Sequence, residues 1–368
     1  MPLYLTDDQI LLRDTAREFV AEHAPPAHLR ALRDASDATG FSRDLWKQFA
    51  ELGLTGILIP EADNGLGLGH VEAGVVLEEI GRNLSPSPFL ATAVAAVEAI
   101  KGTPHAAHWF PGILAGETVA ALAIDEGSKH DGRIAMQAER AGNGFRLSGA
   151  KRFVVHGHVA DLLIVAANTG GGTTLFAVPN DATGLTATPE RLTDSSIAAR
   201  LTFAGVEVDA DAVIGEVDQG DARLAAILSA GRVGASAEMA GVGGGAMDMT
   251  VAYLKDRKQF GVAIGSFQAL QHRAAHLYSE MEVARAAVLK AQQLLDAGHD
   301  ATGAVSVAKA MTGLATTLAV QEGVQMHGGI GMTDEYDIGL YMKRARVLAE
   351  LFGDQNFHAD ALARAAGY

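Results

Sequence analysis

Residues 251–273, VAYLKDRKQFGVAIGSFQALQHR, decide how the C-terminal part of this chain folds. Val251 to Lys258 continue a helical pattern of apolar residues, and Gly261 and Gly265 then interrupt it. A second helix is expected to begin at Phe267. The stretch therefore predicts a helix, a sharp break and another helix.

The break also combines features of an anion site. Ser266 is expected to cap the second helix, whose first N–H groups carry partial positive charge, and Arg257 adds a cation. Phe260 and Phe267 can cover an apolar or aromatic ligand surface. The other polar side chains of this corner are Gln259, Gln268, Gln271 and His272. The alternative is an ordinary helix–turn–helix corner with a solvated charged face.

Composition is that of a globular protein, with 368 residues, 48% hydrophobic and 20% charged. A net charge of −15 and a pI of about 5.3 argue against nonspecific nucleic-acid binding. The absence of cysteine excludes disulfides and thiolate chemistry. The N-terminal sequence has no apolar segment typical of a signal peptide, and no apolar run is expected to reach transmembrane length. We therefore expect a cytoplasmic protein without a membrane partner.

Residues 1–116 are expected to form an N-terminal α-helical domain. Apolar patterns predict helices at 6–23, 43–52, 71–82 and 88–101. Thr6 is a plausible cap for the first helix. The pair Glu78–Glu79 suggests acid–base chemistry, but adjacent helical residues point about 100° apart, so surface or capping roles are favoured.

Residues 117–215 change to β-branched runs separated by turn signals. Strands are predicted at 118–124, 133–140, 144–148, 152–155, 161–167, 173–178, 184–188 and 200–208. This spacing fits a small antiparallel barrel or sandwich. His156 and His158 alternate along one predicted strand and form a candidate metal pair, but a structural role is favoured because no third ligand is near in sequence. Asp125–Ser128 is either a ligand-contacting loop or an ordinary turn.

Residues 216–368 are expected to be helical throughout. Helices predicted at 222–258, 267–297, 301–325 and 336–351, with short turns between them, indicate an antiparallel four-helix bundle. The turn at 325–331, QMHGGIG, is a second candidate contact site. Gly328 and Gly329 let a backbone approach a ligand without a Cβ, and Gln325 offers both a donor and an acceptor.

The order of these motifs resembles the acyl-CoA dehydrogenase family. The matching motifs are Arg257-Lys-Gln-Phe-Gly261, Phe267-Gln268 and Gln325-x-x-Gly-Gly329, together with Ile59-Pro60-Glu61, Glu78-Glu79-x-Gly81-Arg82 and Gly149-x-Lys151. The resemblance covers almost the whole chain. It implies an α+β fold with an N-terminal helical domain, a middle antiparallel β-barrel and a C-terminal four-helix bundle.

The resemblance also implies an activity. Members of the family are FAD oxidoreductases that dehydrogenate acyl-CoA thioesters at the α,β position, with electron-transfer flavoprotein as a candidate acceptor. A glutamate removes the α-proton, and the β-hydride goes to flavin N5. Members form dimers or dimers of dimers, in which the adenosine-diphosphate end of each FAD reaches the neighbouring subunit. The residues that match this FAD contact are Arg257, Gln259, Phe260, Phe267, Gln268, Gln325, Gly328 and Gly329.

The chain departs from the family at the catalytic base. The usual glutamate position holds Phe352, and the position used by other branches holds Gly231, so no catalytic residue is assigned. General-base catalysis is worth about a hundred- to ten-thousandfold in rate. Glu238 and Asp354 are the nearest carboxylates in sequence, although polar packing and a helix cap explain them as well. Arg232, which follows Gly231, is a candidate substrate-binding residue.

The flavin-ring half of the site departs too. The family's flavin-binding loop corresponds only loosely to Ile124–Lys129, and the family's Trp-x-Thr appears as Phe153-Val-Val155. Phe153 can still pack on a ring, whereas Val155 cannot donate a hydrogen bond from its side chain.

These departures suggest the base-lacking subunit of a two-subunit (α2β2) acyl-CoA dehydrogenase, a class known from bacterial steroid side-chain degradation. The alternatives are a self-sufficient homo-oligomeric dehydrogenase with an unusual base and a flavin monooxygenase-like relative. The small residues at 234–246 suggest room for a bulky, ring-bearing acyl group.

Overall fold

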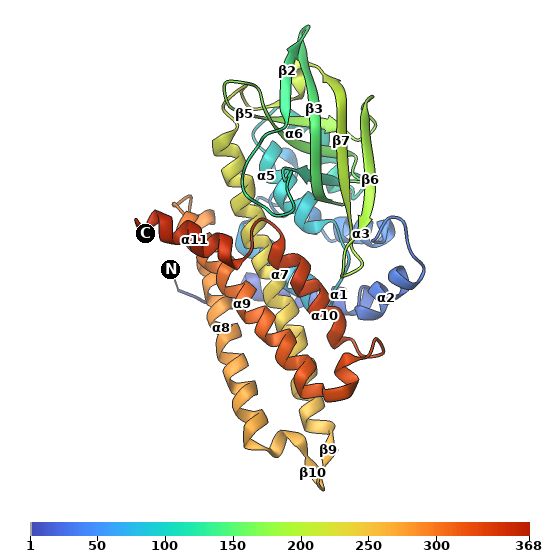
Figure 1. The fold of residues 1–368 in the computed structure, drawn as a ribbon, viewed down its shortest axis with the longest axis vertical. Helices are drawn as coiled ribbons and strands as arrows, with labels where there is room; N and C mark the ends of the chain where they lie inside the picture. Colours follow the sequence, from blue (N-terminus) through green and yellow to red (C-terminus); the bar gives the residue numbers. More distant parts are fainter. Residues whose placement is uncertain (1) are drawn as a thin grey trace. The chain divides into compact units, whose positions relative to one another are not determined.

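The computed structural model describes residues 2–368, which form two compact units. The first, here called the bundle unit, combines the N-terminal residues up to Ala31 with His70–Ser85 and Arg232–Tyr368. The second, here called the sheet unit, contains Leu32–Gly69 and Pro86–Gly231. Figure 1 shows the ribbon of both units. The division into domains at residues 116 and 215 stays a prediction.

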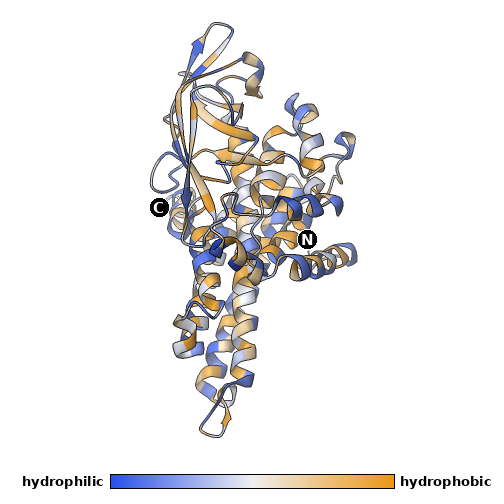
Figure 2. Ribbon diagram, turned by 90° about the vertical axis from the view of Figure 1, so that its right-hand side faces the viewer, coloured by the Kyte–Doolittle hydropathy of each residue, from blue (hydrophilic) through white to orange (hydrophobic). Residues whose placement is uncertain are grey.

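The sheet unit contains one eight-stranded sheet with the order β6-β7-β3-β2-β4-β5-β8, with β1 beside β4. The strands are β1 Ala120–Ala123, β2 Gln137–Ala141, β3 Gly144–Val155, β4 Leu162–Asn168, β5 Thr173–Pro179, β6 Leu185–Arg191, β7 Ile197–Val208 and β8 Val213–Ile214. The helices are α3 Arg43–Glu51, a π-helical segment Leu90–Ala96, α5 Val97–Ile100 and α6 His105–Leu114. Figure 2 shows largely hydrophobic residues along the central strands.

The predicted closed antiparallel barrel is wrong. Within the described residues, β6 and β8 end the strand order and do not pair with each other. β6 is largely exposed and carries Pro189, as edge strands do, and β8 has only two residues. β1 runs parallel to β4, with Ala120 opposite Leu162, so the sheet is mixed. Alternation within strands reports which face is buried, and it does not report whether the sheet closes.

The two strands predicted at 144–148 and 152–155 are one strand, β3. Its pairing with β7 shifts register between Leu147 and Ser148 and again between Lys151 and Val154. Phe153 has a φ of 53°, so the second shift bends the backbone locally. The break in the apolar pattern therefore marked a bulge instead of a turn.

The bundle unit contains the helices predicted at 6–23, 71–82, 267–297, 301–325 and 336–351 and most of the helix predicted at 222–258. They are α1 Asp7–His23, α4 His70–Arg82, the part of α7 (Asp221–Asp256) from Arg232 onward, α8 Gln268–Asp296, α9 Thr302–His327 and α10 Ile338–Glu350. The prediction missed α2, Pro26–Asp34. It also missed α11, Gln355–Ala365, which packs on α9. A core cluster joins Met239 and Val242 of α7 to Val320 of α9 and Leu348 of α10. Thr6 caps α1 as predicted, with a complete capping box.

The expectation that no apolar run reaches transmembrane length is wrong, because one segment has the length and composition that such a span requires. Within the described residues, the segment Thr302–Met332, which includes α9, is long and apolar enough to pass that test. Most of it is buried, and it carries the buried Lys309. These features are typical of the central helix of a globular bundle, so the segment is weak evidence for a membrane span.

Candidate functional site

The break after α7 is a small β-hairpin. β9, Lys258–Gln259, pairs antiparallel with β10, Val262–Ala263. Phe260 and Gly261 between them have φ values of 56° and 83°, as a two-residue type I′ turn requires. The Phe260 side chain is 93% exposed, in a backbone conformation that costs a residue with a Cβ roughly 1 kcal/mol. The Phe260 ring lies 6.2 Å from the Phe267 ring in an edge-to-face arrangement, so the two aromatic side chains form one exposed pair at the hairpin.

The first turn of α8 has no side-chain cap. The predicted capping role of Ser266 is wrong, because its hydroxyl donates to the Ala263 carbonyl and Phe267 occupies the N-cap position. Ser266 instead belongs to the short 3-10 turn Ile264–Ser266, which precedes α8. The leading N–H groups of α8 are thus left for another acceptor, and such helix N-termini are anion-binding positions.

The hairpin and the glycine turn lie at the same end of the bundle (Figure 1). Arg273 of α8 and Glu322 of α9 form an ion pair of 2.5 Å near the two helix ends. The rings of Tyr253 and His327 lie 4.5 Å apart and join α7 to the end of α9. The structure therefore brings together two motifs that are more than fifty residues apart in sequence.

The residues at this end fit a diphosphate with an attached aromatic group. A Cβ added at Gly328 or Gly329 would meet no atom within 4 Å, so the backbone there is open. The Nε2 atom of His327 is buried and, within residues 2–368, has no hydrogen-bond partner. Burial lowers the pKa of His327 and so favours the neutral form of the ring. The predicted contact residues are all exposed there, namely Arg257, Gln259, Phe260, Phe267, Gln268, Gln325, Gly328 and Gly329.

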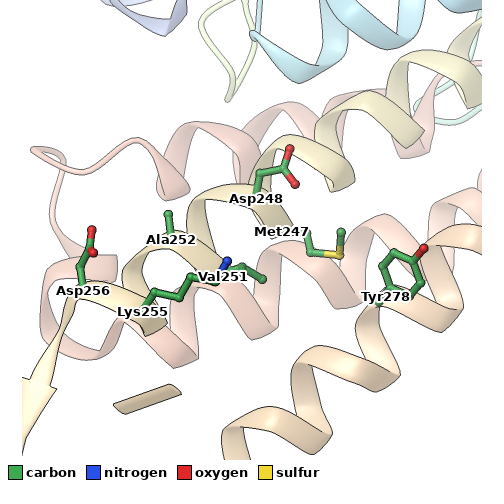
Figure 3. Close-up of a pocket in the computed structure, with 7 residues that line it drawn as sticks. All are labelled: Met247, Asp248, Val251, Ala252, Lys255, Asp256 and Tyr278. Atoms are coloured by element: carbon green, nitrogen blue, oxygen red, sulfur yellow. The ribbon is translucent and has the colours of Figure 1, made fainter. Parts of the chain in front are cut away.

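A groove of about 540 Å³ runs along α7 close to this end (Figure 3). Its lining residues are Met247, Asp248, Val251, Ala252, Lys255, Asp256 and Tyr278. Met247 points toward Tyr278 of α8, and Asp248 is ion-paired with Arg82 of α4. The groove contains none of the predicted contact residues.

Phe352, at the predicted position of the usual base, is part of a backbone network. Phe352 is 8% exposed and has a φ of 59°. Its carbonyl accepts a hydrogen bond of 3.1 Å from the Arg232 Nε, and the guanidinium also lies over the Phe357 ring. The candidate substrate-binding arginine is therefore engaged with the turn that follows α10, and its role toward substrate stays a prediction.

The two replacement carboxylates have structural partners. The Glu238 side chain is 4% exposed, and its Oε1 lies 2.5 Å from the Arg344 Nη2. The Asp354 Oδ1 accepts the N–H groups of Asn356 and Phe357 and caps α11. Polar packing and a helix cap account for both side chains. Neither arrangement aims a free carboxylate at a substrate.

The paired glutamates on α4 bind different partners. Glu79 is fully buried and forms an ion pair of 2.8 Å with Arg17 of α1, so the expected surface role is wrong for this residue. Glu78 bonds Arg285 of α8 at 3.0 Å. Both carboxylates thus tie α4 to its neighbours in the bundle unit.

His156 and His158 do not share a strand face, because β3 ends at Val155. Their Nε2 atoms donate to the carbonyls of Ser87 and Ala38, respectively. Within residues 2–368, no group of three His, Asp or Glu side chains is placed to hold a metal ion.

The loop at Asp125 is held by two polar pairs that sequence patterns did not identify. Glu126 accepts a bond of 2.7 Å from the fully buried Lys151, and also the N–H of Met136. His130 bonds Asp125 at 2.7 Å. Burial lowers the pKa of Lys151. The loop is thus held by Lys151 of β3 and by His130, and the choice between a ligand-contacting loop and an ordinary turn stays a prediction.

Comparisons with known proteins cover most of the chain. Residues 6–117 match the family model for the acyl-CoA dehydrogenase N-terminal domain, and residues 218–367 match the model for the C-terminal domain. Acyl-CoA dehydrogenase IpdE2 of Mycolicibacterium smegmatis is 34% identical, over 95% of this chain and 96% of that protein.

Two solved structures are close in fold. One is the ChsE4–ChsE5 complex of Mycobacterium tuberculosis, with a TM-score of 0.91, 26% identity and full coverage of both chains. The other is the Tcur3481–Tcur3483 steroid acyl-CoA dehydrogenase G363A variant, with a TM-score of 0.90, 31% identity and coverage of 98% and 99%. The chain therefore belongs to the acyl-CoA dehydrogenase family of FAD-dependent oxidoreductases.

Proposed function

We propose that this chain is the base-lacking subunit of a two-subunit acyl-CoA dehydrogenase and completes the FAD site of a catalytic partner chain. The proposal rests on which residues occupy the two predicted positions of the catalytic base. Phe352 and Gly231 occupy them, and the nearby carboxylates of Glu238 and Asp354 are committed to Arg344 and to the cap of α11.

The end of the bundle that carries the β9–β10 hairpin and the glycine turn supports the same proposal. Bound FAD would accept the substrate's β-hydride. Arg257 and the uncapped start of α8 would neutralise its diphosphate, and Phe260 would cover its adenine. The glycine turn would admit the ligand close to the backbone. This chain would therefore bind and orient the cofactor, and the proton would be taken by the partner.

Two relatives support a two-chain assembly. The ChsE4–ChsE5 structure is a complex of two differently named proteins, and the Tcur3481–Tcur3483 structure is named as a steroid acyl-CoA dehydrogenase. We extend the second name to this chain and propose a ring-bearing, steroid-derived acyl-CoA as the substrate, handled in the cytoplasm. Electron-transfer flavoprotein is the proposed acceptor.

The glycines of α7 no longer argue for a bulky substrate. A Cβ at Gly241 would lie 1.9 Å from the Glu78 carbonyl, and a Cβ at Gly245 would lie 2.6 Å from the Arg82 carbonyl. These glycines allow α7 to pack closely against α4. The ring-bearing substrate therefore rests on the relative alone.

The test is to purify this chain alone and together with a co-expressed, glutamate-bearing family chain. We expect little FAD on the lone chain, and full FAD occupancy and turnover of steroid-derived acyl-CoA only in the complex. Arg257→Gln should reduce FAD occupancy of the complex, whereas the neighbouring Lys258→Gln serves as the matched control. Full FAD occupancy and turnover by the lone chain would refute the proposal and favour a self-sufficient homo-oligomer.

A further inference from the structure

Lys309 of α9 is a buried cation that the proposed function does not use. It is 1% exposed, and its Nζ donates to the carbonyls of Leu348, Ala349 and Gly353 at 3.1, 2.9 and 2.9 Å. An ammonium group has three protons and no acceptor, so these bonds use its full donor capacity. Leu348 and Ala349 belong to the last turn of α10, whose carbonyls have no partner within their own helix. Lys309 thus caps α10 from a different helix.

The same turn is held at a second point. The Phe352 carbonyl accepts bonds from the Arg232 Nε at 3.1 Å and from the His358 Nε2 at 3.2 Å. Because a carbonyl only accepts, His358 must carry a proton on Nε2. Asp354 then starts α11. Within the turn Leu351–Asp354, Arg232 and His358 bind the Phe352 carbonyl and Lys309 binds the Gly353 carbonyl, and none of these bonds uses the side chain at position 352.

The backbone of this turn is strained. Phe352 and Gly353 have φ values of 59° and 103°, and a non-glycine residue in the left-handed region is uncommon. Such conformations persist where the surroundings fix them. The cations of Lys309 and Arg232 and the ring of His358 supply that constraint.

Keeping a charge at Lys309 has a cost. Burial, together with the nearby Arg232 cation, lowers the pKa of Lys309 to about 7, while Asp354 and Glu350 oppose this shift. A methionine of similar length would fill the same space without that cost. The lysine is therefore explained by the carbonyls that it binds and not by packing.

We propose that Lys309 is a positioning residue that fixes the turn Leu351–Asp354, so that the platform of the family's catalytic base stays formed whichever side chain occupies position 352. The meaning of this turn as the base platform rests on the family relationship and the proposed function. The dependence of the turn's backbone geometry on Lys309 rests on neither of them, so the experiment uses neither flavin nor substrate.

The experiment is hydrogen–deuterium exchange by mass spectrometry on the full-length chain at about pH 6, where Lys309 is charged. We expect Lys309→Met to lower the protection of backbone amides against exchange in peptides covering 348–356 by about tenfold or more. This is the effect expected from losing hydrogen bonds to a charged group. Protection of α4, which does not touch this turn, should stay within about twofold. Lys290→Met on α8 should leave both regions unchanged, and Lys309→Arg should restore part of the lost protection.

The second variant is Phe352→Glu, which restores the family's residue. Its turn should keep wild-type protection within about twofold, and this result does not require that Lys309→Met folds. Wild-type protection at 348–356 in Lys309→Met would overturn the proposal. Equal loss over the turn and α4 in Lys309→Met, or an opened turn in Phe352→Glu, would overturn it as well.

Discussion

The Arg232 Nε donates a hydrogen bond of 3.1 Å to the backbone carbonyl of Phe352. Phe352 and Gly231, which directly precedes Arg232, occupy the two positions where we predict the catalytic base of the family. In our proposal neither position supplies a base, and the Arg232 side chain holds the backbone of the turn at Phe352.

Glu238 is predicted to be a structural residue. Glu238→Gln breaks its buried pair with Arg344 and should lower the free energy of unfolding by about 2 kcal/mol. Replacing both residues by leucine should recover most of that loss, because no unpaired charge remains. Urea unfolding of the lone chain measures these changes. Turnover of the complex should be unchanged in Glu238→Gln, and a loss of kcat without a loss of stability would make it a base.

Asp354 is predicted to act only as a helix cap. Asn caps helices about as well as Asp, so Asp354→Asn should change the free energy of unfolding by less than about 0.5 kcal/mol. Asp354→Ala should cost about 1 kcal/mol. A general base would show a different order, because Asn cannot accept a proton. A large drop in kcat for Asp354→Asn would contradict the assignment.

Phe260→Asn is predicted to have opposite effects on stability and on cofactor binding. Asn-Gly is the preferred type I′ pair, so the variant should stabilise the lone chain by up to about 1 kcal/mol. Loss of the exposed ring should weaken FAD binding by the complex about tenfold or more, as expected when a buried aromatic contact is removed. Thermal unfolding and FAD titration measure the two effects. Unchanged FAD affinity would exclude Phe260 from the cofactor site.

Lys309 is predicted to make the free energy of unfolding rise with pH above about pH 7. Its folded-state pKa of about 7 lies below the ordinary value of 10.5, so between these values the unfolded chain binds a proton that the folded chain does not. The free energy of unfolding should therefore rise with pH, by at most about 1.4 kcal/mol per unit. Urea unfolding between about pH 7 and pH 9 should show this rise relative to Lys309→Met. Lys290→Met should retain it, and a constant difference between wild type and Lys309→Met would contradict the assignment.

His327 is predicted to weaken the protein in acid. Burial lowers its pKa below the ordinary 6.5, so the stability that its neutral ring contributes is present above that value and is lost as pH falls through the folded-state pKa. The free energy of unfolding should fall as the pH drops below about 6.5, and His327→Gln should remove part of this fall. His276→Gln, on the exposed face of α8, is the matched control. Identical acid profiles for wild type and His327→Gln would refute the prediction.

Much of the fold could be predicted from local patterns. Apolar periodicity identified α7, α8, α9 and α10 to within a few residues, because each helix buries a stripe of its own surface. Short elements were missed, such as the two-residue strand β8, because they carry too few residues for a periodic signal. Lys309 had a visible signal, a lone cation in an apolar helix, but its partners lie about forty residues away.

The sequence by itself determined the family and the order of the helical and β segments, and it led to the prediction that Phe352 and Gly231 replace the base. These features are local, since each depends on residue identity and spacing along the chain. Only the tertiary structure decided that the sheet stays open, that Glu238 and Asp354 are engaged elsewhere, and that Lys309 holds the turn after α10. Each of these depends on which distant backbone or charge a side chain meets, and that is fixed only when the elements pack.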